Sequence, residues 1–162
     1  MGDVPALALA FYAALAAIMA AGSWIDLRSR RIPNWLCAAN LGVGLGYTGL
    51  AYDDGGAGWA GIGLAALHVL AALLVTMSLF ALRMIGAGDA KFYASMAAWL
   101  PPGRAIWLLV SVALAGLILL LGFMVWRLAR RSKARADDKS DFAKLPYGLA
   151  IGAGGLLAVA LT

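Results

Sequence analysis

Long apolar runs, separated by short segments that hold most of the basic residues, constrain the fold of this chain more than any other feature. Hydrophobic residues make up 64% of its 162 residues and charged residues only 13%, and this composition is far too apolar for a soluble domain. The apolar runs cover residues 4–25, 32–52, 59–82, about 88–100, 104–126 and 147–161. We therefore predict an all-α integral membrane protein that forms a single membrane domain with six transmembrane helices.

The apolar runs differ in whether they are long enough to cross a membrane as a helix. A helix needs about 20 residues to cross a hydrocarbon core of about 30 Å. Four runs reach that length, whereas the fourth and sixth are short, and short spans imply local bilayer thinning or a cavity. No positive charge precedes the first run and the arginines follow it, so we expect a retained membrane helix rather than a signal peptide.

The basic residues predict the orientation of the spans. Three arginines follow the first span, Arg83 and Lys91 lie between the third and fourth, and seven basic residues lie within residues 127–144. Only Arg104 among the 13 lysines and arginines lies on the other side. Because basic loops stay in the cytoplasm, we predict that both termini lie outside and that these loops lie inside.

The segment 127–144 is rich in charge and poor in apolar residues. This composition is typical of a solvated cytoplasmic loop. It also fits a helical extension of the fifth span that lies on anionic lipid headgroups. In either case the net charge of +5 belongs to loops between spans, so we expect membrane lipids rather than nucleic acid as partners.

The sequence indicates no cofactor and no metal site. Cys37 is the only cysteine and lies within an apolar run, where we expect it to pack. His68 is alone in the middle of a span, without neighbours at ligand spacing, and we expect it to be a hydrogen-bonded core residue. Glycine patterns of the dinucleotide-binding type begin at Gly44 and Gly56, but neither follows a strand. We therefore reject both.

Other glycines and the tryptophans are predicted to support the membrane fold. Gly42 with Gly46, and Gly148 with Gly152, have the spacing that lets two helix backbones approach closely. Most tryptophans lie near predicted span ends, as expected for anchors at the membrane interface. The tryptophans are Trp24, Trp35, Trp59, Trp99, Trp107 and Trp126.

Two carboxylates stand out because they lie at the ends of apolar runs. Asp26 follows a span that runs inward and Asp89 begins one that runs outward, so both are predicted at the cytoplasmic surface. Taken alone, Asp26 fits a salt-bridged loop residue and Asp89 fits a helix cap. Two carboxylates that face one cavity, however, suggest an aspartic protease.

The residues around these carboxylates add to the candidate site. Gly86 and Gly88 remove side-chain bulk where a substrate backbone could come close to Asp89. Asn34 either caps the second span or points into the site. Lys91 has three possible roles: its ammonium group binds an acidic group of the substrate, favours the ionised form of an aspartate, or extends to lipid headgroups.

Together, three motifs resemble those of the type IV prepilin peptidases, GxGD-type aspartic proteases of bacterial membranes. The first is an Asp followed by a basic stretch and Ile-Pro-Asn, here residues 26–34. The second is GxGDxK, here residues 86–91, and the third is Pro-Tyr-Gly, here residues 146–148. Their order along a chain with six spans makes the resemblance specific.

The resemblance implies an endopeptidase in the bacterial inner membrane, with Asp26 and Asp89 as the catalytic pair and no metal or other cofactor. Its substrate would be a prepilin-like precursor, cut to release a basic leader at the cytoplasmic surface. The chain has one cysteine and none of the paired CxxC motifs of the longer members. It therefore resembles the short, peptidase-only members that serve tight-adherence (Flp) pili, and we expect no N-methyltransferase activity.

Two other functions compete with this one. The presenilin and signal-peptide-peptidase class also uses GxGD, together with a Tyr-Asp pair and a Pro-Ala-Leu stretch. These letters occur here only as residues 52–53 and 5–7, which the predicted topology places outside, on the opposite side from Asp26 and Asp89. The second alternative is a non-enzymatic polytopic transporter or assembly factor, in which Asp26 and Asp89 bind ions or cap helices. Replacement of one Asp by Asn discriminates between a protease and this alternative, because an amide keeps the shape but cannot act as a base.

Overall fold

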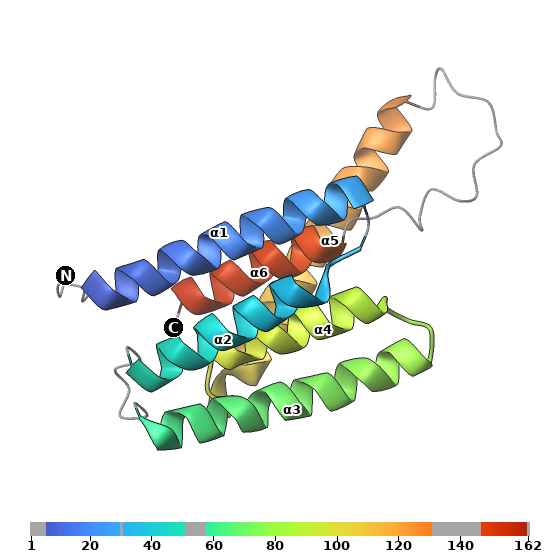
Figure 1. The fold of residues 1–162 in the computed structure, drawn as a ribbon. Coiled ribbons are helices and arrows are strands. Elements are labelled where there is room, and N and C mark those ends of the chain that lie inside the picture. Colours follow the sequence, from blue (N-terminus) through green and yellow to red (C-terminus); the bar gives the residue numbers. More distant parts are fainter. Residues whose placement is uncertain (1–5, 30, 51–57, 131–146, 162) are drawn as a thin grey trace.

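The chain folds into a bundle of helices that run alternately between the same two ends (Figure 1). The computed structural model describes residues 6–29, 31–50, 58–130 and 147–161, and all of the regular structure among them is helical. The helices are α1 (Ala6–Ser29), α2 (Asn34–Leu50), α3 (Trp59–Ala81), α4 (Ala87–Met96), η1 (Ala97–Trp99), η2 (Pro102–Arg104), α5 (Ala105–Arg130) and α6 (Tyr147–Ala160). The all-α prediction is confirmed.

Three stretches are long and apolar enough to cross a membrane, namely Ala6–Ser29, Trp59–Ala81 and Pro102–Trp126. The helix α6 is apolar but has only 14 residues, while α2 has 17 and α4 has 10. Large apolar side chains are exposed along α3 and α5, as expected for helices that face lipid. The number of membrane crossings and their orientation remain predictions.

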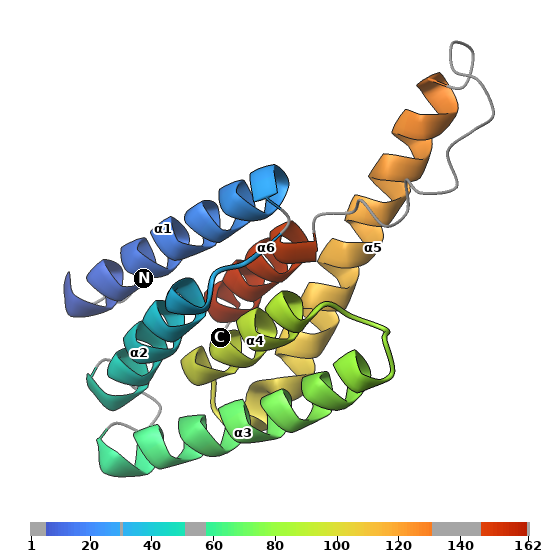
Figure 2. The same ribbon diagram turned by 45° about the vertical axis from the view of Figure 1, so that its right-hand side comes forward.

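The helix α4 stops early and lies in the centre of the bundle (Figure 2). It ends in the 3₁₀ turn η1, after which Leu100 is extended and precedes Pro101, a position that disfavours helix. Nδ1 of His68 is hydrogen-bonded to the carbonyl oxygen of Leu100 at 2.8 Å. His68 is buried, so its predicted role as a hydrogen-bonded core residue is confirmed.

Buried hydrogen bonds link the end of α4 and the turn η1 to α2. The amide of Asn40 donates to Oγ of Ser95 at 2.9 Å, and Nε1 of Trp99 donates to Oδ1 of Asn40 at 3.0 Å. Asn40 and Trp99 are fully buried. The prediction that Trp99 is an interfacial anchor is wrong: its indole N–H has a partner in the core, where such a donor needs one. The other five tryptophans are exposed, and Trp59 is the most exposed of them.

The glycines pack helices together, but not all at the predicted positions. A Cβ added at Gly148 or Gly152 of α6 would meet side-chain atoms of α1, so this pair does allow close approach. On α2 the prediction for Gly42 is wrong, since a Cβ there would meet nothing within 4 Å. Gly44 is the residue that packs tightly, because a Cβ there would lie 2.8 Å from the ring of Trp99.

Two helices extend beyond their predicted spans. The helix α1 continues to Ser29, so Asp26 lies within its last two turns rather than in a loop. The helix α5 continues to Arg130, so the start of the basic segment is helical, while residues 131–146 lie outside the described part of the chain. Cys37 is buried in α2, in agreement with the predicted packing role.

Candidate active site

Asp26 and Asp89 are the only carboxylic residues among the residues that the structure describes. Asp26 belongs to the end of α1 and Asp89 to the first turn of α4, and these ends lie at the same end of the bundle (Figure 1). Asp26 is buried, at 6% exposure, and Asp89 is half-buried. The two carboxyl groups are near enough to interact electrostatically, although they are far apart in the sequence.

The start of α6 positions the carboxyl group of Asp26. The backbone N–H of Gly148 donates a hydrogen bond to Oδ2 of Asp26 at 2.8 Å. The first N–H groups of a helix have no partner within the helix, and they favour an anionic acceptor. The N-terminus of α6 therefore holds a carboxylate that belongs to another helix.

Gly148 is required at this position for a steric reason. A Cβ added there would lie 2.8 Å from Oδ2 of Asp26 and 3.0 Å from its Cβ and Cγ, closer than such atoms pack. Only a residue without a side chain brings the N–H this near to the carboxylate. This contact gives the Pro-Tyr-Gly motif a physical role that the sequence alone did not reveal.

Gly86 and Gly88 make different contacts around Asp89. A Cβ added at Gly86 would lie 2.9 Å from Oδ2 of Asp89, whereas one at Gly88 would meet the backbone N of Ile32 at 3.5 Å. Gly86 therefore leaves room for the carboxyl group, and Gly88 packs against the connection between α1 and α2. Because Asp89 lies in the first turn of α4, its negative charge is also favourable at that helix end.

This difference predicts unequal effects of adding one methyl group. Gly86→Ala is expected to turn the Asp89 side chain and to lower activity by about tenfold or more, because small displacements of catalytic groups are costly. Gly88→Ala introduces only an ordinary van der Waals contact, so activity is expected to stay within about threefold of wild type. Rates measured side by side on the same substrate test the pair. Equal losses would mean that Gly86 does not serve Asp89.

Lys91 and Asn34 form a contact of their own. Nζ of Lys91 donates to Oδ1 of Asn34 at 3.1 Å and so links α4 to the first residue of α2. The two residues line a small pocket between α2, α3 and α4, whereas Asp89 lines a larger one between α3, α4, α5 and α6. The structure therefore does not bring Lys91 into the cavity of Asp89.

The larger cavity has a volume of about 510 Å³ and an almost entirely apolar lining. Its polar side chains include those of Asp89, Tyr93 and Tyr147. Tyr93 was not among the predicted site residues, although it follows Asp89 by four positions and so shares its face of the helix. An apolar cavity with a few polar groups is typical of a binding site.

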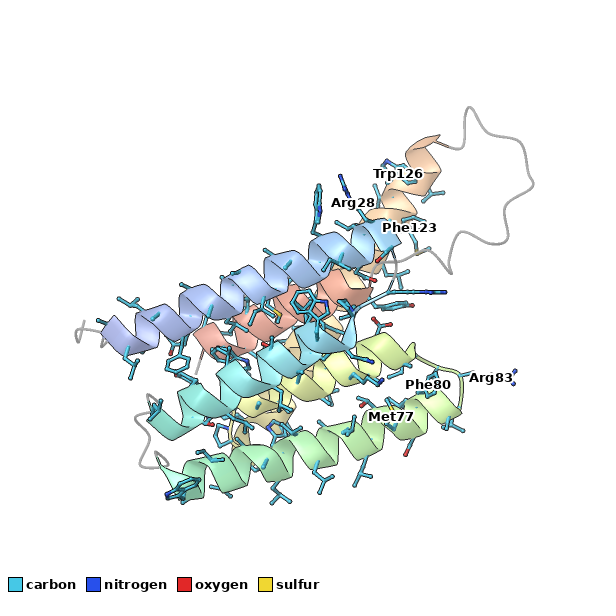
Figure 3. The ribbon with its side chains drawn as sticks, in the orientation of Figure 1. Arg28, Met77, Phe80, Arg83, Phe123 and Trp126 are labelled. Atoms are coloured by element: carbon cyan, nitrogen blue, oxygen red, sulfur yellow. The ribbon has the colours of Figure 1, made fainter. Side chains whose placement is uncertain are left out.

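Basic side chains lie at the same end of the bundle as the two carboxylates. Figure 3 shows Arg28 at the end of α1 and Arg83 just beyond the end of α3. The guanidinium of Arg28 lies 4.6 Å from the ring centroid of Trp24, a cation–π distance. Basic and aromatic residues of this kind are common where a membrane protein meets lipid headgroups, and the side of the membrane remains a prediction.

Comparison with known proteins identifies the family. The model of the type IV leader peptidase family matches residues 13–121, which include Asp26 and Asp89 and make up well over half of the chain. Neither the curated proteins nor the solved structures compared with the chain give a match. Leader peptidases of this family are membrane proteases that act on precursor proteins, and the apolar helices agree with a membrane protein. The chain belongs to the type IV leader peptidase family.

Proposed function

We propose that this protein is an aspartic endopeptidase of the GxGD type, which removes the basic leader from prepilin-like precursors, including Flp-type ones, at the cytoplasmic face of the bacterial inner membrane. Asp26 and Asp89 are its catalytic residues. The observation that supports the proposal is the placement of these carboxylates: α1 and α4 bring them to one end of the bundle, near enough to interact electrostatically.

The mechanism follows from two carboxyl groups that share one proton, because nearby like charges do not both ionise easily. The ionised carboxylate takes a proton from a water molecule, and the oxygen of that water attacks the scissile carbonyl carbon. The protonated carboxyl group donates a hydrogen bond to the carbonyl oxygen and then transfers its proton as the tetrahedral intermediate forms. The carboxyl group that took the proton from water then transfers it to the amide nitrogen, and the C–N bond breaks. A hydroxyl of the intermediate returns its proton to the other carboxylate, which releases the leader with a new carboxyl end and the mature chain with a new amino end.

The surrounding residues support this chemistry. The N–H of Gly148 fixes the Asp26 carboxyl group, and Gly86 leaves the space that the Asp89 carboxyl group occupies. The precursor keeps its basic leader in the cytoplasm, where Gly86, the last residue before α4, gives the connection between α3 and α4 freedom to close on the substrate. Anionic lipid headgroups offset the repulsion between the leader and the basic loops.

A cleavage assay tests this function. The purified protein is placed in liposomes with a candidate prepilin, and a mobility shift equal to the leader is expected on a gel. Mass spectrometry of the product then tests the prediction that the new N-terminus is not methylated when S-adenosylmethionine is added. If candidate precursors from pilus and secretion systems all remain intact, a non-enzymatic role replaces the proposal.

The contact between Lys91 and Asn34 leads to a further prediction. If Lys91 acts through Asn34 on the start of α2, Lys91→Ala lowers cleavage equally for a normal precursor and for one whose acidic residue after the cut site is neutralised. Loss of an exposed hydrogen bond of this kind is expected to cost about threefold to tenfold in rate. Asn34→Ala should have the same effect. A loss seen only with the normal precursor would instead mean that Lys91 pairs with the substrate acid.

A further inference from the structure

The cavity next to Asp89 is an elongated groove rather than a compact pocket. On α3 its wall is a single stripe formed by His68, Ala71, Ala72, Val75, Thr76 and Leu79. The facing wall on α5 extends from Ala105 to Gly116, and its residues also recur at helical intervals of three or four residues. Each stripe spans eleven residue steps, so the groove is about 16 Å long. It therefore has the length of about three helical turns.

The groove is open to the surface and small residues lie along it. Val75 and Leu109 are exposed at 62% and 59%, so the two walls do not close over the space between them. Ala113, Gly116 and Ala150 line the part where α5 meets α6. Small residues of this kind let the backbone of another helix approach closely.

The two ends of the groove differ in chemistry. Asp89 and Tyr147 lie at the end where α4 and α6 begin, and His68 lies at the opposite end of the α3 stripe, where Nδ1 is already bound to the carbonyl of Leu100. The end next to Asp89 thus offers polar groups to an occupant. The rest offers mainly apolar contact, because Oγ1 of Thr76 is bound to backbone carbonyls. A lipid acyl chain would leave those polar groups without partners, which is costly in an apolar environment.

We propose that this groove holds the first three turns or so of the precursor's membrane helix, so that the helix packs between α3 and α5 with its N-terminal end beside Asp89. This inference rests on the proposed function. The first N–H groups of a helix are unpaired and suit a polar site. The segment before the helix is then extended and accessible to the two aspartates, and the groove sets the cut at the boundary between leader and stem.

The first test fills the groove. Gly116→Leu is expected to lower the rate of precursor cleavage by about tenfold or more, because overpacking excludes the incoming helix. Gly122→Leu is the matched control: it makes the same change in α5 at a site where an added Cβ meets nothing within 4 Å. This control should cleave at the wild-type rate. Gly116→Ala, whose Cβ would lie 3.8 Å from that of Ala150, should keep the fold and lose less activity.

The second test locates the bound helix directly by disulfide cross-linking. The protein carries Cys37→Ala, Asp89→Asn to retain the precursor, and either Val75→Cys or Leu74→Cys. These two positions are adjacent and equally exposed, at 62% and 63%, but only Val75 lines the groove. The precursor carries one cysteine at each of its first twelve stem positions in turn. Cross-links are expected with Val75→Cys alone, at one or two stem positions that lie one helical turn apart, because a disulfide needs Cα atoms within about 7 Å of each other.

The outcomes separate this inference from the proposed function. Cleavage by the wild-type protein reports the function, and if no precursor is cleaved, both proposals fall. If the wild type cleaves but Gly116→Leu and Gly122→Leu are equally active, the groove holds lipid or nothing and the inference is overturned. Equal cross-linking at Val75→Cys and Leu74→Cys, or none at either, also overturns it.

Discussion

Asp26→Asn and Asp89→Asn are each expected to lower precursor cleavage by about 10²-fold to 10⁴-fold, the usual contribution of a general acid or base. The physical reason is the pairing of the carboxyl groups. One must be ionised to activate water while the other carries a proton, and an amide can do neither. Because the two groups act as a unit, the double variant should be little worse than either single one. Single-turnover rates in liposomes measure this.

The controls separate lost chemistry from a lost fold. The oxygen of an Asn at position 26 can still accept the N–H of Gly148, so the contact between α1 and α6 is expected to survive. Thermal unfolding in detergent should therefore differ little from wild type. Asp53→Asn, in the loop predicted to lie outside, serves as a matched change and should retain full activity. Substantial turnover by either active-site variant would exclude the paired mechanism.

Much of the architecture could be predicted because apolar patterning governs membrane proteins. Runs of apolar residues indicate helices, since backbone groups in lipid must be satisfied within the segment. The helices observed in the structure lie where the sequence predicted spans, including the short fourth one. Asp26 and Asp89 could be singled out because a charge next to an apolar run is costly and hence unusual.

Other features could not be predicted because they depend on contacts between distant parts of the chain. Nothing local to Trp99 shows that its N–H donates to Asn40, 59 positions away, and a position near a span end suggested an interfacial role instead. The distinction between Gly42 and Gly44 likewise depends on which face of α2 meets Trp99. The spacing of glycines in the sequence identifies pairs that lie on one face of a helix. It does not identify the residues that this face contacts.

The role of Gly148 is the clearest example, and it leads to the second large effect. Gly148→Ala is expected to lower cleavage by about 10²-fold, because a displacement of about 1 Å at a catalytic group has that cost. The added Cβ would lie 2.8 Å from Oδ2 of Asp26, so either the carboxyl group or the start of α6 must move. Either movement breaks the hydrogen bond that fixes Asp26.

Gly152→Ala is the control that isolates this effect. It adds the same methyl group one turn further along α6 against the same helix α1, where the Cβ would lie 3.1 Å from Oγ of Ser23 rather than against a catalytic carboxylate. Both variants disturb the packing of α1 on α6, so both should lower thermal stability by similar amounts. If Gly148 positions Asp26, only Gly148→Ala lowers kcat. Any effect on KM through the α6 wall of the groove is expected in both variants alike, because Ala150 and Ile151 lie between the two positions. Equal losses of kcat in the two variants would reduce Gly148 to a packing residue, and the hydrogen bond to Asp26 would then have no part in catalysis.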